Sequence, residues 1–376
     1  MIQEITISNF KCFEEDQTFK LNDINVFTGL NGRGKSSVLQ TILLISQSFT
    51  DKGSLENIRT ANGKFVNLGS FEDIVNLGTS KNEIFLSIKT DDDSENKIGI
   101  TIVRNQENKD IADIQSLQID GQEMVDEKSG SNDDTCEAVS IKSIGVNSTV
   151  AGLQQFKKVF YVAADRIGPT NTMPLISGTT INSIGVRGEN LFNFFADNQD
   201  VTNQLALDAS EILLGASLRA EKNVTSVDLY IDSADNSRGF KPVNVGFGYS
   251  YILPVLTTLI GVPERSIVIV ENPEAHLHPG AVSRLTQKIV EYSKKKHLQV
   301  FLETHSDHVV NALRVAVKKK VGDIDRKEVS IIHFSREERT NQPPIISQIK
   351  IDAEGNLSDY PSDFMDEWMK QMTELV

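Results

Sequence analysis

One short stretch near the N-terminus restricts the fold of this chain more than any other. The run NVFT, rich in residues that favour strands, lies at 25–28, the glycine-rich sequence GLNGRGKSS follows at 29–37, and apolar residues then recur at helical spacing from 38 to 45. The run predicts a strand, and the spacing predicts a helix of about three turns. A strand that passes through a glycine-rich turn into a helix is the first half of a parallel α/β unit.

The glycine-rich turn fits the pattern G-x-x-x-x-G-K-[ST]. Its glycines let backbone N–H groups turn inward around phosphate oxygens, and the helix start adds the positive end of its dipole. We expect Lys35 to reach the β- and γ-phosphates of a nucleotide and Ser36 to bind Mg²⁺. An ordinary glycine-rich βα turn is the alternative. The expected nucleotide contacts are Gly29, Asn31, Gly32, Arg33, Gly34, Lys35, Ser36 and Ser37.

A later strand is expected to carry acidic residues at its end. The sequence SIVIVENPE covers 266–274, and its four apolar residues predict a fully buried strand. Parallel sheets bind ligands at the carboxyl ends of their strands, so we expect Glu271 to bind the metal together with Ser36. Glu274 is the candidate for activating the attacking water. Two solvated glutamates are the alternative.

Two histidines follow these glutamates in the sequence AHLHP at 275–279. A zinc site is one interpretation, because histidine and glutamate are both zinc ligands. The other is a helix over 279–296, because proline suits the first helical position. Strands expected at 299–302 and 329–334 then complete the order of a parallel sheet.

Three segments together carry a family resemblance: GLNGRGKSS, ENPEAHLHP, and FLETHSDHVVNALR at 301–314. They resemble the ATP-binding-cassette (ABC) type ATPases related to RecF, to the overcoming-lysogenisation-defect nucleases and to the heads of structural-maintenance-of-chromosomes (SMC) proteins. The resemblance implies an α/β P-loop NTPase of the ABC ATPase head type, with ATP and Mg²⁺ as ligands. We expect a mixed sheet flanked by helices, an antiparallel β insert where the pattern has period two, and no long coiled coil, because no long heptad pattern is present. The resemblance also implies that His305 is a switch residue at the γ-phosphate.

The acidic strand end departs from the usual pattern of this superfamily, which reads Asp-Glu-Pro. Here Asn272 occupies the place of the base, and its amide cannot accept a proton at neutral pH. Slow hydrolysis, use of Glu274 as the base, and a long-lived ATP-bound clamp are the alternatives. No signal locates the glutamine that usually links nucleotide to partner movement, and Gln40 and Gln47 are interpreted as ordinary helical residues.

The sequence NVGFGYSYILP at 244–254 lies about twenty residues before the acidic strand. Cassette ATPases carry LSGGQ at this place, where it caps the γ-phosphate bound by the opposite subunit. The resemblance puts Gly246 in the place of the serine, retains Gly248, and leaves Ser250 to supply the hydroxyl. It therefore implies a homodimer that sandwiches two ATP molecules. A glycine-rich βα turn is the alternative.

The hydrophobic pattern of the rest of the chain, together with the motifs, divides the chain into five predicted segments. Residues 83–160 alternate with period two, 189–219 have helical spacing, and 224–231 suggest a strand. The predicted segments are an N-terminal ATPase segment at 1–82, an antiparallel β insert at 83–160, a helical and β middle segment at 161–240, a C-terminal ATPase segment at 241–340, and a short module at 341–376.

Composition argues against general polyanion-binding proteins, disulfide-rich or zinc-bound scaffolds, and membrane proteins. The chain has 38 Lys and Arg against 52 Asp and Glu, a net charge of −14, which argues against general polyanion binding. Cys12 and Cys136 are too few for a disulfide scaffold or a zinc site of their own, and we expect both to be reduced. Because no apolar window reaches a membrane span and the N-terminus lacks a signal pattern, we expect a soluble, cytoplasmic protein with no membrane contact.

The C-terminal residues 350–368 resemble a short module on one branch of these ATPases, as do YVAADRIGP at 161–169 and FVNLGSFEDIV at 65–75. Members of that branch commonly occur in bacterial anti-phage or mobile-element systems. The resemblance thus implies an ATP-driven dimeric switch that controls a separate nuclease or toxin. A RecF-like clamp on DNA is the main alternative, ahead of a transporter subunit and a binding protein with an inactive nucleotide pocket. We expect no nuclease domain in the tail, because the segment after the last expected strand is shorter than an independent domain.

Overall fold

The computed structural model describes residues 1–50, 54–91, 97–123, 151–233, 236–335, 344–361 and 363–375. The chain divides into two compact units. The first, here called the P-loop unit, comprises Met1–Asn22, Gly29–Val159 and Phe334–Ser347. The second, here called the acidic-strand unit, comprises Asp23–Thr28, Phe160–His333 and Gln348–Val376.

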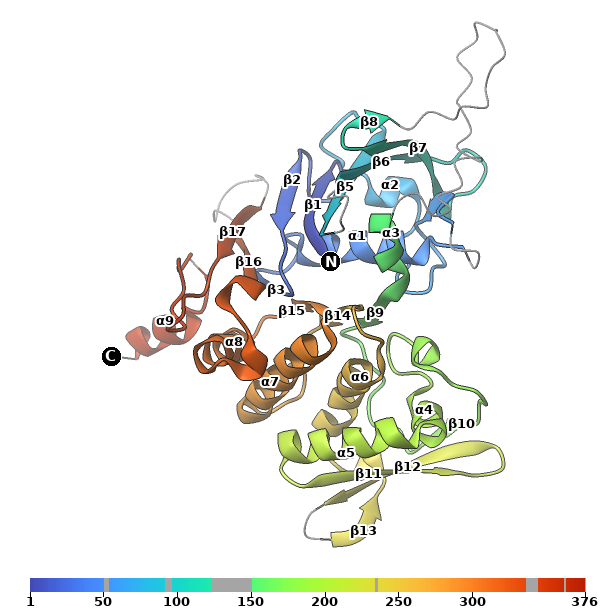
Figure 1. Ribbon diagram of the computed structural model, residues 1–376, viewed down its shortest axis with the longest axis vertical. Helices are drawn as coiled ribbons and strands as arrows, with labels where there is room; N and C mark the ends of the chain where they lie inside the picture. Colours follow the sequence, from blue (N-terminus) through green and yellow to red (C-terminus); the bar gives the residue numbers. More distant parts are fainter. Residues whose placement is uncertain are drawn as a thin grey trace, which may run out of the picture. The chain divides into compact units, whose positions relative to one another are not determined.

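The P-loop unit is built on an antiparallel sheet of seven strands. The order is β2-β1-β5-β6-β7-β4, and β8 pairs with β7. In β5 and β6 large aliphatic residues are buried at alternate positions, which is the period-two pattern of a strand with one face in the core. Figure 1 shows α1 and α2 beside this sheet. The bounds are β1 Ile2–Ser8, β2 Gln17–Lys20, β4 Asn57–Arg59, β5 Glu83–Thr90, β6 Lys97–Arg104, β7 Ile111–Ile119, β8 Gln122–Glu123, α1 Lys35–Gln47 and α2 Phe71–Ile74.

The antiparallel strands expected within 83–160 are present as β5 to β8. They join the N-terminal strands in one sheet, because β5 pairs directly with β1. Residues 124–150, which include Cys136, lie outside the described residues. The end of the segment is helical rather than extended, with α3 at Ala151–Gln154 and the 3₁₀ helix η2 at Gln155–Lys158.

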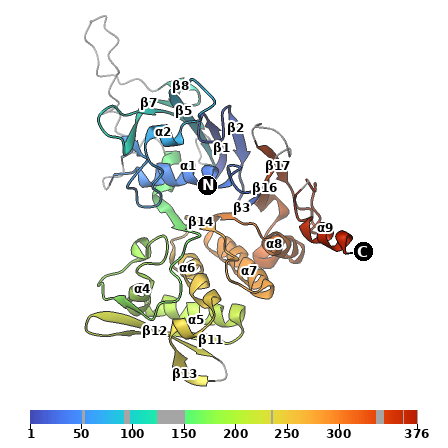
Figure 2. The same cartoon turned by 180° about the vertical axis from the view of Figure 1, so that it is seen from behind.

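A second sheet has six strands in the order β17-β16-β3-β15-β14-β9, and most of its residues belong to the acidic-strand unit. Strands β3, β15 and β14 are parallel neighbours, as the strand–helix–strand order predicted. Helices α6, α7 and α8 lie beside this sheet (Figure 2). The bounds are β3 Ile24–Gly29, β9 Val159–Val162, β14 Ile267–Glu271, β15 Gln299–Glu303, β16 Val329–Ser335, β17 Ile345–Ile349, α6 Phe247–Gly261, α7 Pro279–Lys296, α8 Asp307–Lys319 and α9 Glu367–Glu374.

A smaller four-stranded sheet belongs to the same unit, in the order β10-β12-β11 with β13 on β12. The helical interpretation of 189–219 is correct for two helices and wrong at its end, because a strand begins at Ala216. Leu214 and Gly215 have φ of 59° and 105°, and this left-handed backbone ends the helix. The bounds are α4 Leu191–Asp197, α5 Gln199–Leu213, β10 Thr172–Pro174, β11 Ala216–Lys222, β12 Ser226–Ser233 and β13 Asn236–Phe240.

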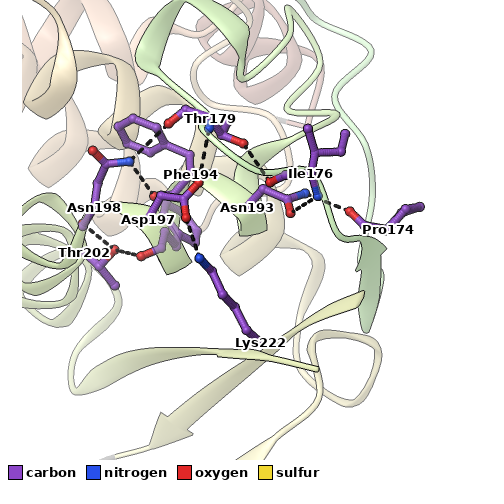
Figure 3. Close-up of polar contacts among 10 residues, drawn as sticks. Pro174, Ile176, Thr179, Asn193, Phe194, Asp197, Asn198, Thr202 and Lys222 are labelled. Atoms are coloured by element: carbon purple, nitrogen blue, oxygen red, sulfur yellow. Dashed lines mark hydrogen bonds and ion pairs between the residues drawn. The ribbon is translucent and has the colours of Figure 1, made fainter. Parts of the chain in front are cut away.

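Two side chains of α4 hold the loop that follows β10 (Figure 3). The Asn193 carboxamide accepts a hydrogen bond from the backbone N of Ile176 at 2.8 Å, and Asp197 accepts one from the backbone N of Thr179 at 3.1 Å. Lys222 of β11 lies 2.5 Å from the Asp197 carboxylate and holds the pKa of that carboxyl below its usual range. Polar contacts therefore fix the loop, the helix and the strand together.

Candidate functional site

The P-loop has a backbone that only glycine adopts readily. Gly29, Gly32 and Gly34 have φ of 118°, 70° and 105°. A Cβ on Gly29 would lie 2.1 Å from the carbonyl oxygen of Phe334, and one on Gly34 would lie 2.7 Å from the Cys12 sulfur. The turn is thus wound tightly against its surroundings, which fixes the direction of its backbone N–H groups.

Lys35 is buried, with 3% of its surface exposed, and begins α1. Its Nζ donates to the carbonyl oxygens of Gly29 and Leu30 at 2.9 and 2.8 Å, so the ammonium lies folded over the loop. Within the described chain, nothing would lie within 4 Å of a Cβ on Gly32. The first turn of α1 carries no acidic residue, which leaves its positive end available to an anion. These residues fit the phosphates of a nucleotide.

The other predicted P-loop residues differ in exposure. Asn31 is exposed, Arg33 and Ser36 are half-buried, and Ser37 is buried. Burial raises the pKa of the Cys12 thiol, which is hydrogen-bonded to Ser37. Cys12 thus packs beside the P-loop as a mostly protonated thiol, in keeping with the expectation that it is reduced.

The carboxyl end of the acidic strand lies in one row with its two neighbours. Glu271 of β14 pairs in register with Glu303 of β15, and Glu303 pairs with Phe27 of β3. The P-loop begins two residues after Phe27 in the chain. Strand register therefore brings the acidic strand end into the same row as the residues that lead into the P-loop, which is where parallel sheets bind ligands.

The Glu271 carboxylate is held by the segment that follows β9. It accepts a hydrogen bond from the backbone N of Ala164 at 3.2 Å and another from the Tyr161 hydroxyl. Burial raises the pKa of Glu271, and these hydrogen bonds and the nearby Arg166 oppose that rise. The carboxylate is oriented but short of positive charge, so a bound cation would favour its ionised form.

Arg166 is a site residue that sequence reasoning missed. Its surface is only 2% exposed, and its guanidinium donates to the carbonyl oxygens of Glu271, of Asn272 at 3.1 Å and of Tyr251 at 3.3 Å. Burial lowers its pKa to about 10, so it stays charged at neutral pH. Arg166 thereby ties the first turns of α6 to the end of the acidic strand.

The turn after the acidic strand brings Glu274 and His305 together. Asn272 has φ of 44°, a left-handed backbone that asparagine tolerates, and its backbone N–H donates to the backbone carbonyl oxygen of Glu303 at 2.7 Å. The backbone N of His305 donates to Glu274 Oε1 at 3.2 Å. The other carboxylate oxygen, Oε2, is buried and has no hydrogen-bond partner among the described residues.

The glycine-containing segment at 246–250 begins α6, as a helix-start site requires. Gly246 is the exposed N-cap residue, and Phe247 is 55% exposed. A Cβ on Gly248 would lie 2.9 Å from the carbonyl oxygen of His276, so this glycine permits close packing against the turn after the acidic strand. Ser250 is buried, with 9% of its surface exposed. Its role as the hydroxyl donor stays a prediction.

The second histidine of the AHLHP segment has a structural role. His278 is the N-cap of α7, and its Nδ1 accepts a hydrogen bond from the backbone N of Gly280 at 3.2 Å. Pro279 occupies the first helical position, as predicted. Across the part of the chain that the structure describes, no group of three or more His, Cys, Asp or Glu residues is placed to hold a metal, and no helix is long and apolar enough to cross a bilayer.

Two family profiles match the chain. AAA_21, described as "AAA domain, putative AbiEii toxin, Type IV TA system", matches residues 24–311. DUF3696, described as a protein of unknown function, matches residues 324–375. The first match contains the P-loop, the acidic strand and His305, and the second overlaps the predicted C-terminal module from residue 341 to residue 375.

Two solved structures share the fold. An SMC head bound to the C-winged helix domain of ScpA has a TM-score of 0.54 at 12% identity, covering 93% of this chain and 98% of its own. An SMC head with an extended coiled coil, bound to the C-terminal domain of ScpA derived from Pyrococcus furiosus, has a TM-score of 0.53 at 12% identity. The match covers 100% of this chain and 99% of that structure's chain. The predicted ABC ATPase head fold is therefore confirmed.

One curated relative matches over a short region. The DNA replication and repair protein RecF of Cytophaga hutchinsonii is 36% identical over 74 residues, which is 19% of this chain. The match spans a fifth of the relative's length.

Proposed function

The chain belongs to the AAA_21 family, and on that premise we propose that it binds and hydrolyses ATP with Mg²⁺ as a dimeric switch. The observation that carries this proposal is the P-loop geometry. Three glycines with positive φ and the buried ammonium of Lys35 surround a turn that opens into the start of α1. Such a turn is built for the phosphates of a nucleotide.

The residues proposed to hold Mg²⁺ are Ser36 and Glu271. The ion would neutralise charge on the phosphate oxygens. Burial raises the pKa of Glu271, and a bound cation would stabilise its ionised carboxylate. Glu274 is proposed to accept the proton of the attacking water. Its unpartnered buried oxygen is the site available for that proton, and the adjacent N–H of His305 orients the carboxylate.

Hydrolysis is proposed to be slow because Asn272 replaces the usual base. An amide accepts no proton at neutral pH, and the left-handed backbone at this position suits asparagine. A slow ATPase remains in its ATP-bound form for longer. That property suits a switch, whose signal is the bound state, better than a motor.

Gly246, Gly248 and Ser250 are proposed to contact the nucleotide of a second copy. Phe247 and the nearby Val243, which are 55% and 50% exposed, support this, because large apolar side chains exposed at the same place favour a surface that is covered in an assembly. A sedimentation experiment with a non-hydrolysable ATP analogue tests it. Wild type should become a dimer, Phe247→Glu should stay monomeric, and the control Leu77→Glu, which changes a 92% exposed residue, should dimerise. Dimerisation of Phe247→Glu would exclude α6 from the interface.

The cellular role that we propose is control of a separate effector, a nuclease or toxin, in a bacterial anti-phage system. The toxin-system description of the matched family supports this role. A RecF-like DNA clamp is the second candidate, favoured by the 36% identity to RecF over 74 residues. A mobility-shift titration with duplex DNA across salt concentrations separates them. A clamp should bind, with affinity falling steeply as salt rises, whereas a switch on a protein partner should produce no shift.

Phosphate release under steady-state conditions tests the ATPase itself. Lys35→Ala should lower the rate of ATP hydrolysis at least tenfold, and the matched surface change Lys20→Ala should leave it unchanged. Equal rates in wild type and Lys35→Ala would show that the P-loop is not the site of turnover.

A further inference from the structure

A pocket of about 760 Å³ opens in the P-loop unit, at the opposite end of α1 from the P-loop. Its lining includes Gln47, the last residue of α1, whereas Lys35 at the P-loop is the first. At 1.5 Å per residue, the 13 residues of α1 separate the two sites by about 20 Å. The pocket is therefore separate from the predicted nucleotide site, and its volume lies within the range of small-molecule sites.

The pocket gathers positive charge in an acidic protein. Arg59, Lys64 and Lys157 line it, and no acidic side chain does so within the described chain. None of these three cations forms an ion pair with a described acidic residue. Asp110 accepts a hydrogen bond from the amide of Asn62, a lining residue, at 2.8 Å. The lining thus carries three charges that an anion would neutralise.

Two aromatic rings accompany the cations. The Lys64 Nζ lies 5.0 Å from the centroid of the Phe65 ring, and the Lys157 Nζ lies 5.5 Å from that of Phe49. Both rings line the pocket. Such contacts hold the ammonium groups near the pocket without an ion pair. Aromatic faces in a basic site also stack on nucleobases.

The pocket wall is fixed to the last turn of α1. Gln47 is buried, and its side chain donates to the carbonyl oxygen of Arg59 at 2.8 Å and accepts from the backbone N of Val66 at 2.9 Å. Ser46 donates to the carbonyl oxygen of Phe156 at 2.6 Å, which anchors the segment that carries Lys157. Helix η2 packs against α1, and Figure 1 shows α3, which leads into η2, beside α1. The backbone segments that carry the three cations are thereby tied to one helix, which fixes the wall of the pocket.

We propose that this pocket binds a free nucleotide, or a nucleotide-sized molecule with at least two phosphate charges, as a site distinct from the P-loop. Three cations match a multiply charged phosphate better than a single carboxylate, and arginine binds phosphate through two hydrogen bonds. A long nucleic acid would also be repelled by the rest of a protein with net charge −14. A small anion in the pocket interacts mainly with the charges within about 10 Å, so the net charge opposes its binding less.

Calorimetric titration with ADP tests the proposal in the Lys35→Ala background, where the P-loop contributes little. Against that background, Arg59→Gln, Lys64→Gln and Lys157→Gln together should weaken ADP binding at least tenfold. A control with the same loss of charge at exposed positions of the same unit, Lys20→Gln, Lys81→Gln and Lys109→Gln, should stay within twofold. A charge-retaining variant, Arg59→Lys with Lys64→Arg and Lys157→Arg, should bind within about threefold, which separates lost charge from lost folding.

Two results would overturn the proposal. One is equal ADP affinity in the glutamine variant and its surface control, because the pocket would then contribute nothing. The other is tighter binding of a 20-nucleotide single strand than of ADP, lost in the same glutamine variant, because the pocket would then serve a nucleic acid. Neither result bears on turnover at an intact P-loop, so the proposed ATPase function stands or fails separately.

Discussion

The backbone N–H of His305 donates a hydrogen bond to the Glu274 carboxylate, with 3.2 Å between the nitrogen and Oε1. The two residues are 31 positions apart and come from the ends of neighbouring parallel strands. This bond leaves the second carboxylate oxygen as the available proton acceptor. It also connects the candidate base to the predicted switch residue, so movement of one would alter the other.

Glu274→Gln should lower ATP turnover about 100-fold while leaving ATP affinity within threefold, because an amide keeps the hydrogen bond from His305 but accepts no proton. Phosphate release and equilibrium binding measure the two quantities. The matched control is Glu354→Gln, which changes an exposed glutamate of the same unit. Wild-type turnover in Glu274→Gln would remove this residue from the mechanism.

Arg166→Met should lower the free energy of unfolding by about 3 kcal/mol, because three carbonyl oxygens at the end of the acidic strand and in α6 lose their donor. Arg166→Lys should recover part of that loss, since an ammonium keeps the charge but cannot span all three oxygens. Urea denaturation measures both. Arg187→Met, at a half-exposed surface arginine, should change stability by less than about 1 kcal/mol. Equal effects at the two arginines would contradict the assigned role of Arg166.

Gly29→Ala should destabilise the chain by about 3 kcal/mol or more, because it combines φ of 118° with a Cβ placed 2.1 Å from the carbonyl oxygen of Phe334. Gly121→Ala is the matched control. Gly121 has φ of 80° and no described atom within 4 Å of the Cβ position, so only the backbone penalty of about 1 kcal/mol applies. Denaturant titrations of both variants measure the loss in free energy of unfolding and so separate backbone strain from steric clash. Comparable losses in the two variants would mean that the loop around Gly29 accommodates the methyl group.

Glu271→Gln should stabilise the nucleotide-free protein at pH 8, and the gain should shrink as the pH falls. The pKa of Glu271 is raised by burial, so proton binding favours the folded state. Its contribution to stability is present at low pH and is lost as pH rises through the folded pKa. The difference in Tm between variant and wild type from pH 8 to pH 5 measures this effect. A difference that grows toward pH 5 would have the wrong sign.

Local pattern was sufficient to predict the P-loop and the parallel strands. The spacing of Gly29, Gly34 and Lys35 marks the turn, and four consecutive apolar residues mark the strand that ends in Glu271. Both features lie within short windows, where sequence and structure correspond directly. The helix start at Pro279 was equally local, since proline suits that position.

Long-range contacts were not predictable in this way. The carbonyl oxygens bound by Arg166 lie 85 to 106 residues away in the chain, so no periodicity around Arg166 marks its role. Gln47 has the spacing of an ordinary helical residue, and only the fold shows that it anchors the wall of a basic pocket. The strand at Ala216 was mistaken for helix although Gly215, with φ of 105°, is a common helix stop signal, because the interpretation of 189–219 extended the helical spacing past this glycine.

Calorimetric titration of wild type and Lys35→Ala with a non-hydrolysable ATP analogue and Mg²⁺ tests the nucleotide site most directly. Wild type should bind one equivalent of the analogue per chain at the P-loop. Lys35→Ala should weaken the affinity of this site at least tenfold, and Lys20→Ala should leave it unchanged. Affinity and stoichiometry that are the same in all three proteins would contradict the assignment of the P-loop as the ATP site.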